Sequence, residues 1–165
     1  MSARQRIISL SVAIALLATF LPLGVASAAS VPPEYTIKSN TANKCLDVYQ
    51  GTARAGTTVG LYRCDASDNA ERFAFGLNAK GYVEIFFKPT LCVGASKVGS
   101  SYKATLQSCS ATSTYEHQIS KPSQQAVFSF SAGSLTAPVS SAAFSQAVFT
   151  SGTSSADQIW QFRLI

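Results

Sequence analysis

Apolar residues along the chain form short runs or alternate with polar residues, and they show almost no helical periodicity. After Pro32-Pro33, twelve such runs follow at spacings near ten residues, separated by Gly, Ser, Asn and Thr. They lie at 34–39, 45–49, 58–64, 72–77, 82–87, 91–95, 104–109, 117–121, 126–131, 134–139, 147–151 and 158–165. Many short strands with turn residues between them are typical of an all-β barrel or sandwich. We therefore expect an all-β domain of about twelve strands.

The N-terminal segment has a different pattern. A short basic start precedes an apolar run over residues 7–25, and residues 26–28 (Ala-Ser-Ala) then give the small-x-small motif of a cleavage site. The run is nearly long enough to span a bilayer, so a membrane anchor is the alternative. Pro22 near its end favours cleavage. We predict a signal peptide over 1–28, a mature domain over 29–165 with no membrane span, and an extracellular location.

The mature chain repeats itself with a period near 45 residues. Glu71 and Glu116 each lie seven residues after a cysteine, and Gln158 lies seven residues after Ser151. The segments that precede these residues superimpose when Leu61, Leu106 and Val148 are placed in register. The predicted repeats cover about 34–79, 80–121 and 122–165. Three units are too few for a propeller, so we expect them to close around a threefold axis.

Four cysteines, all in the mature domain, indicate two disulfides, because exported chains keep cysteines paired. The separations from Cys45 to Cys64 and from Cys92 to Cys109 are 19 and 17 residues. Two similar local loops are therefore the simplest of the three possible connectivities, and each bridge contributes about 3 kcal/mol. Zinc is the alternative, but there is no Cys-x-x-Cys pair and His117 is the only histidine. We expect no metal.

Charge and motif content exclude several functions. The formal charge of +5 includes two arginines of the leader, and the other basic residues are scattered singly. A nucleic-acid surface would need them clustered on one face, so we expect no nucleic acid as a partner. There is no nucleophile elbow, His-Glu-x-x-His motif or phosphate loop. The acids near residues 47–71 imply no cleft that could place two carboxylates at one glycosidic bond, so we expect no enzymatic activity.

The stretches "KCLDVYQG" and "GTTVGLYRCD", together with Gln-x-Trp at 158–160, resemble the ricin B-chain-type lectin family. Bacterial members of that family are trefoil carbohydrate-binding modules appended to xylanases and other glycosidases. The resemblance covers the mature chain and implies a β-trefoil, with six strands in a barrel and six in a hairpin cap, and no cofactor. It implies a glycan or polysaccharide of galactose or xylose type as the partner. The family's core Trp positions hold Phe73, Gln118 and Trp160.

Transferred to this chain, the family site gives Asp47 as the acid, Tyr62 as the ring and Asn69 as the amide. A carboxylate can accept hydrogen bonds from two adjacent sugar hydroxyls, a ring can cover the C–H face, and an amide can both donate and accept. Ala70 stands where the family has its amide, so Asn69 must bulge to reach the site. Asp47 could instead close a tight turn by accepting backbone N–H groups, and Tyr62 could be a half-buried strand aromatic.

The other two repeats have lost parts of this site. In the second, Gly94 and Gln107 replace the acid and the ring; in the third, Thr136 replaces the acid and Phe149 supplies a ring, with Asp157 before Gln158. We expect one working site, with Glu71 holding a loop by hydrogen bonds and Tyr49 serving in packing. The leading hypothesis is a secreted sugar-binding protein. The alternative is a degenerate trefoil that binds a protein, as an inhibitor, a toxin accessory or an envelope component.

Overall fold

The computed structural model describes residues 32–78, 80–109, 124–152 and 155–165. The predicted signal peptide and the expected run at 117–121, with His117 and Gln118, lie outside these residues. The strands, in chain order, are β1 (Glu34–Ser39), β2 (Cys45–Val48), β3 (Val59–Tyr62), β4 (Phe73–Leu77), β5 (Val83–Phe86), β6 (Leu91–Val98), β7 (Ser101–Ser108), β8 (Gln125–Ala126), β9 (Ser129–Phe130), β10 (Gly133–Thr136), β11 (Ser145–Gln146), β12 (Val148–Thr150) and β13 (Trp160–Leu164). The helical elements are 3₁₀ turns: η1 (Tyr49–Gly51), η2 (Asn69–Glu71) and η4 (Ala156–Gln158).

The prediction of an all-β domain is confirmed within the described residues. All the expected runs except 117–121 overlap a strand, and the one at 126–131 is divided between β8 and β9. None of the described helices is long and apolar enough to cross a lipid bilayer.

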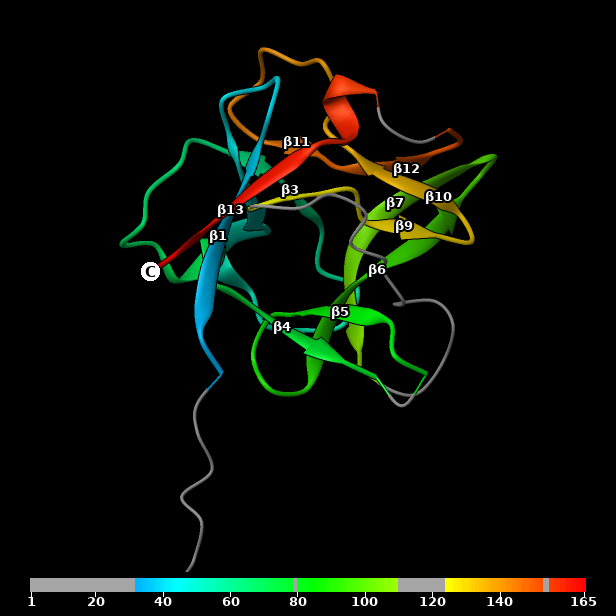
Figure 1. The fold of residues 1–165 in the computed structure, drawn as a ribbon. Helices are drawn as coiled ribbons and strands as arrows, with labels where there is room; N and C mark the ends of the chain where they lie inside the picture. Colours follow the sequence, from blue (N-terminus) through cyan, green and yellow to red (C-terminus); the bar gives the residue numbers. More distant parts are fainter. Residues whose placement is uncertain (1–31, 79, 110–123, 153–154) are drawn as a thin grey trace, which may run out of the picture. The chain divides into compact units, whose positions relative to one another are not determined.

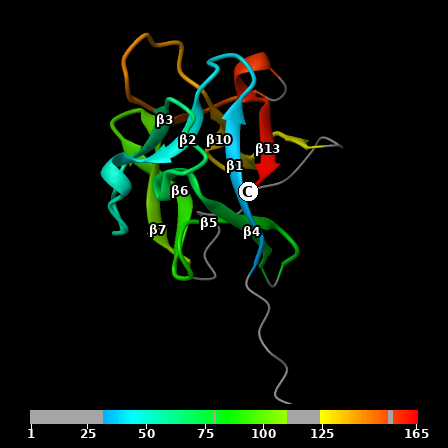
Figure 2. The same cartoon turned by 90° about the vertical axis from the view of Figure 1, so that its left-hand side faces the viewer.

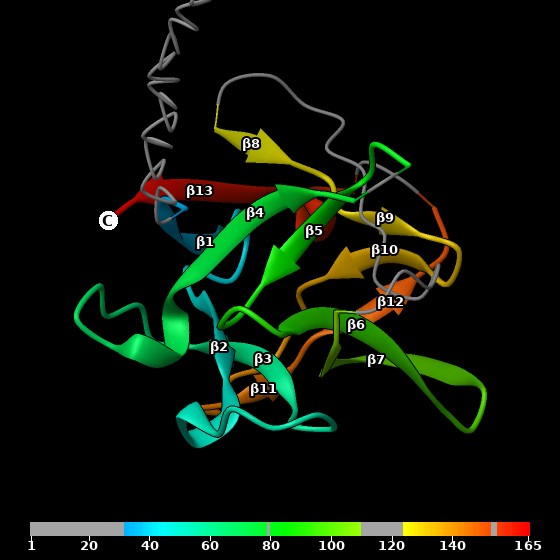
Figure 3. The same cartoon turned by 90° about the horizontal axis from the view of Figure 1, so that it is seen from below.

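The strands form one continuous sheet, in which β11, β3, β2, β1, β4, β5, β6, β7, β12, β10 and β9 are successive neighbours. The last strand returns to the first: β13 pairs antiparallel with β1, with Tyr35 opposite Leu164 and Ser39 opposite Trp160. Figures 1 and 2 show these two strands side by side, and Figure 3 shows the sheet curling around its interior. This pairing joins the first and last strands of the domain.

Three antiparallel hairpins, β2–β3, β6–β7 and β10–β12, are the repeated feature of this sheet. Each places one apolar pair across its strands at the same register, and all six side chains are buried. The pairs are Leu46–Leu61, Val93–Leu106 and Leu135–Phe149. One residue before the first member of each pair, the strand carries Cys45, Cys92 or Ser134, and all three are buried.

The interior is filled by aliphatic side chains and a few large rings. Phe73 and Trp160, at two of the predicted core positions, are fully buried, as expected. Trp160 also donates a hydrogen bond from its Nε1 to the carbonyl of Leu135, at 2.9 Å. A buried indole N–H needs such a partner, so this bond fixes β13 to the hairpin of the third unit.

Both disulfides join cysteines within one hairpin region, Cys45 with Cys64 and Cys92 with Cys109, which confirms the predicted connectivity. The third hairpin has a hydrogen bond at this place, because Ser134 donates from Oγ to the carbonyl of Gly152, at 3.0 Å. The residue corresponding to Cys64 is therefore Gly152. The sequence alignment, which used Ser151, is shifted by one residue.

Candidate functional site

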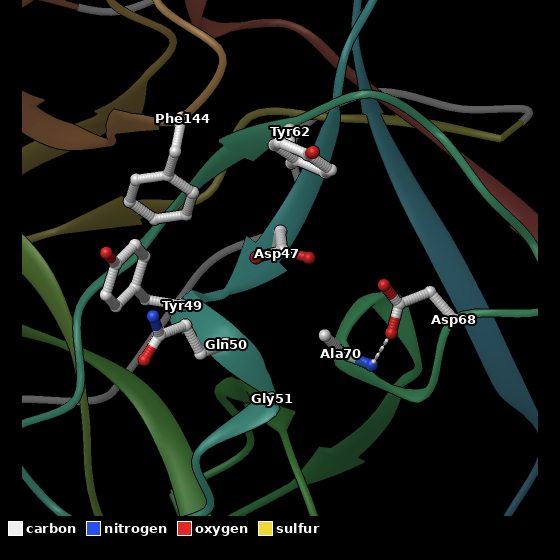
Figure 4. Close-up of a pocket in the computed structure, with 8 residues that line it drawn as sticks. All are labelled: Asp47, Tyr49, Gln50, Gly51, Tyr62, Asp68, Ala70 and Phe144. Atoms are coloured by element: carbon white, nitrogen blue, oxygen red, sulfur yellow. Dashed lines mark hydrogen bonds between the residues drawn. The ribbon is translucent and has the colours of Figure 1, made fainter.

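A pocket of about 430 Å³ opens at the outer end of the first hairpin. It is lined by Asp47, Tyr49, Gln50, Gly51, Tyr62, Asp68, Ala70 and Phe144. These residues come from β2, η1, β3 and η2, and from the loop that leads into β11 (Figure 4). The structure thus brings together the predicted acid and the predicted ring, with contributions from a distant segment.

Asp47 lies in the centre of the pocket (Figure 4). Its position on β2 leaves it only 5% exposed, yet no described residue donates a hydrogen bond to its carboxylate. Burial, and then the negative charge of Asp68, raise the pKa of Asp47 from 3.8 to about 6. The carboxylate lines the pocket, where its oxygens can accept hydrogen bonds from a bound molecule. The alternative in which Asp47 closes a turn by accepting backbone N–H groups is not supported.

Aromatic rings form two sides of the pocket. Tyr62, 40% exposed at the end of β3, lies on one side of Asp47, while Tyr49 and Phe144 lie together on another (Figure 4). The rings of Tyr49 and Phe144 meet edge to face, with centroids 5.0 Å apart. The prediction that Tyr49 serves in packing is therefore incomplete, because its ring both packs and lines the pocket.

Phe144 approaches closely because position 60 is a glycine. A Cβ on Gly60 would lie 2.6 Å from the Phe144 Cζ atom and 2.4 Å from the Ser145 carbonyl oxygen. The loop is held from its other side as well, since Lys44 donates a hydrogen bond from Nζ to the carbonyl of Ala142. The sequence analysis missed Phe144, because the ring comes from a loop far from β2 in sequence.

The remaining side of the pocket is the η2 turn. Asp68 precedes this turn and accepts a hydrogen bond from the Ala70 N–H, at 2.8 Å, so that Asp68 and Ala70 face the pocket. Asn69, the predicted amide of the site, is exposed and is not among the residues that line the pocket. The cap explains the difference, because it turns the backbone so that the residues on either side of Asn69 face inward. The amide that does line the pocket is Gln50, in η1.

Glu71 lies behind the pocket and is fully buried. Its Oε2 accepts a hydrogen bond from the Asp65 N–H, at 2.9 Å, as expected for a residue that holds a loop. Its Oε1 has no partner among the described residues. Burial raises the pKa of Glu71 from 4.5 to about 7; the hydrogen bond from Asp65 opposes this rise, and the charges of Asp47, Asp68 and Asp65 add to it.

The second hairpin has neither the acid nor the ring of the first. Gly94 stands at the acid position, and Gln107 at the ring position folds back onto the hairpin. The Gln107 Nε2 donates to the Ala95 carbonyl at 3.0 Å and to the Ser96 Oγ at 3.2 Å. The amide is therefore used internally.

The third hairpin corrects one expectation. Leu135 is paired with Phe149, so Phe149 occupies the same core position as Leu61 and is only 4% exposed. It supplies no ring to a site. Thr150 stands at the position of Tyr62, and its Oγ1 is hydrogen bonded to the Thr136 Oγ1 at 2.6 Å.

Gln158 occupies, in η4, the place that Glu71 has in η2. Its Nε2 donates to the Oγ1 of Thr150 at 3.0 Å and to the Oγ1 of Thr136 at 3.4 Å. Its Oε1 accepts from the Ser155 N–H at 3.3 Å. At these positions the third unit thus pairs its polar side chains with one another, whereas in the first unit one oxygen of Glu71 has no partner and Asp47 accepts no hydrogen bond from a described residue.

Comparison with known proteins agrees with this architecture. Residues 33–162 match the sequence profile of the ricin-type beta-trefoil lectin domain. No significant match was found among curated protein sequences.

Several solved structures share the fold. The designed threefold-symmetric protein ThreeFoil has a TM-score of 0.67 at 15% identity, over 78% of this chain and 96% of that one. The C-half of the earthworm R-type lectin, solved in complex with GalNAc, has a TM-score of 0.62 at 11% identity, over 81% of this chain and 100% of that one. A mosquitocidal holotoxin has a TM-score of 0.67 at 16% identity over 81% of this chain, which spans 17% of the holotoxin. At these identities the likeness establishes the fold, which is a β-trefoil as predicted.

Proposed function

Because the chain belongs to the ricin-type beta-trefoil lectin domain family, we propose that it binds carbohydrate through the pocket between Asp47 and Tyr62. The observation that carries this proposal is the Asp47 carboxylate, which is 5% exposed, has no hydrogen-bond donor among the described residues and faces a pocket walled by aromatic rings. The hydroxyl groups of a sugar can donate hydrogen bonds to this carboxylate.

The pocket offers each kind of contact that a pyranose needs. Two neighbouring hydroxyls would donate to the two oxygens of Asp47, and the exposed ring of Tyr62 would cover the C–H face of the sugar. Gln50, whose amide lines the pocket, takes the role that the sequence assigned to Asn69. One shallow site of this kind gives affinities near millimolar, or about −4 kcal/mol.

A single site is proposed, because the corresponding positions of the other two hairpins are used internally. Gln107 is bonded to its own hairpin, and Thr136 is bonded to Thr150. The same loss of two sites motivates the second candidate, a trefoil that binds a protein. The two candidates differ at Asp47: a protein-binding surface elsewhere on the trefoil would not depend on this buried carboxylate.

Catalysis and location follow from the same features. A glycosidase needs two carboxyl groups facing one glycosidic bond. Glu71 is fully buried and Asp68 uses one oxygen to cap η2, so we expect binding without hydrolysis.

Disulfides persist in oxidising compartments, so we expect the protein to act outside the cell after removal of the leader.

The test is binding of the purified protein to a glycan array and to immobilised galactans and xylans, with Asp47→Asn as the variant. This change keeps the shape of the side chain and removes the charged acceptor, and we expect at least tenfold weaker binding, since hydrogen bonds to a charged group contribute about 1.5–3 kcal/mol. The matched control is Asp65→Asn, which removes the same charge from a neighbouring loop outside the pocket. Equal binding by the Asp47 variant and the wild type, or no binding to any glycan at millimolar sugar, would refute the proposal.

A further inference from the structure

The pocket carries more negative charge than a neutral sugar requires. Both Asp47 and Asp68 line it, and none of the eight residues that line it is basic. The ion pair between Arg72 and Glu34, at 3.7 Å, lies outside the pocket. A chain with a formal charge of +5 thus places two uncompensated carboxylates around one small cavity.

Neither carboxylate is satisfied by the protein. Asp47 is 5% exposed and receives no hydrogen bond from a described residue. Asp68 receives one, from the Ala70 N–H to its Oδ1, and this bond leaves its second oxygen available. In Figure 4 Asp68 lies on the side of Asp47 that is away from Tyr49 and Phe144. The two carboxylates line the same pocket and repel each other, and a bound cation would relieve the repulsion.

An organic cation fits the pocket better than a metal ion. The described residues contain no group of three or more side chains arranged to hold a metal. The other walls are the rings of Tyr49, Tyr62 and Phe144, and aromatic faces attract ammonium groups while also covering C–H surfaces. A ligand with an ammonium group on a ring that also has a C–H face would contact both the carboxylates and the aromatic rings.

We propose that the preferred ligand is a glycan with a free, protonated amine, that is, an amino sugar that is not acetylated. This inference rests on the proposed carbohydrate site and names its ligand class. The ammonium group lies between Asp47 and Asp68, a neighbouring hydroxyl donates to the other oxygen of Asp47, and the ring of Tyr62 covers the C–H face. Acetylation would remove the charge, and the two carboxylates would then face each other without a cation.

The experiment compares each amino sugar with its neutral parent, because the ratio of the two affinities isolates the amine. The probes are D-galactosamine against D-galactose and D-glucosamine against D-glucose, titrated at about pH 7 into the isotopically labelled protein and followed by amide chemical shifts. At this pH a sugar amine is largely charged. We expect the amino sugar of at least one pair to bind about tenfold tighter, because a charge-assisted bond is about twice as strong as a neutral one. The preference should shrink between about 0.05 M and 0.5 M NaCl, because salt screens it.

Asp68→Asn is the decisive variant. The new side chain keeps an oxygen that can accept from the Ala70 N–H, so the η2 cap is preserved while the charge is removed. We expect the ratio of affinities to fall to about one. Asp65→Asn, the matched control, removes one charge outside the pocket and should leave the ratio unchanged.

The possible failures are distinguishable. Equal binding of amino and neutral sugars by the wild type, or an unchanged ratio in the Asp68 variant, overturns the inference about the amine. If neutral sugars still bind and lose affinity with Asp47→Asn, the proposed function survives that result. If neither member of either pair binds, the glycan array decides the proposed function, and the amino-sugar inference is overturned.

Discussion

Glu71 provides a test of the electrostatics that underlie the site. The change is Glu71→Gln, which keeps the size of the side chain and replaces an ionisable group with an amide. In the wild type, Glu71 is fully buried, its Oε2 accepts the Asp65 N–H at 2.9 Å, and its Oε1 has no partner. The amide of Gln158, at the corresponding place in η4, shows that a glutamine is compatible with this geometry.

The direction of the effect follows from the raised pKa. In the unfolded chain Glu71 titrates near 4.5, whereas in the folded protein burial raises its pKa to about 7. The folded state therefore holds its proton more tightly, and stability is lost as the pH rises through this window. Below about pH 4.5 the group is protonated in both states, so the variant and the wild type should be equally stable.

The magnitude has an upper bound. The rise in pKa from 4.5 to about 7 corresponds to about 3 kcal/mol, since one pKa unit is worth about 1.4 kcal/mol. The neighbouring carboxylates line an open pocket, and solvent screens the repulsion between them and Glu71. We therefore expect Glu71→Gln to raise the free energy of unfolding by about 1–2 kcal/mol at pH 8.

Urea unfolding at about pH 4.5, 6 and 8 measures the free energy of unfolding of the wild type and of Glu71→Gln, with the fluorescence of Trp160 as the probe. Trp160 is the single tryptophan of the chain and is fully buried, so its emission reports on the core. Glu34→Gln is the control: it removes the same charge from an exposed ion pair and should change stability by less than about 1 kcal/mol. Parallel stability curves for the wild type and Glu71→Gln, or a less stable variant at pH 8, would refute the reasoning.

Two further predictions concern packing and covalent bonds. Gly60→Ala should lower the free energy of unfolding by about 2–3 kcal/mol in urea and weaken ligand binding, because the added Cβ would clash with the Ser145 carbonyl oxygen and the Phe144 ring. Unchanged binding would show that Phe144 is no part of the site. Cys92→Ser combined with Cys109→Ser opens a loop with a sequence separation of 17 residues, and it should lower the free energy of unfolding by about 3 kcal/mol without affecting the pocket. A loss of less than about 1 kcal/mol would contradict the chain-entropy argument.

The strands and the core could be predicted from the sequence because both depend on local patterns. Alternation of apolar residues located nearly every strand, and the spacing of cysteines gave both disulfides. The shift at the third hairpin arose because the sequence offers no cysteine there. Without that marker, Val148 and Phe149 are equally plausible core residues, and only the pairing of Leu135 with Phe149 decides between them.

The site was predictable only in part, for a different physical reason. Asp47 and Tyr62 lie on paired strands, so their proximity follows from the hairpin itself. The sequence predicted that Asn69 would reach the pocket, but the residues around it line the pocket instead. The hydrogen bond from the Ala70 N–H to Asp68 fixes this turn, and the sequence pattern did not reveal that bond. Phe144 depends on the packing of two segments about 80 residues apart, and no short pattern in the sequence records it.

This long-range contact changes how the loss of the other sites should be interpreted. In the third unit, Thr136 and Thr150 at the positions of the acid and the ring are bonded to each other, yet the loop of this unit contributes Phe144 to the pocket of the first unit. The pairing of β11 with β3 brings that loop into place, and Gly60 leaves room for its ring. The third unit therefore contributes an aromatic ring to the pocket of the first unit. Because the pairing of β11 with β3 brings Phe144 to the pocket, changes in the loop before β11 should affect ligand affinity as directly as changes in the first unit.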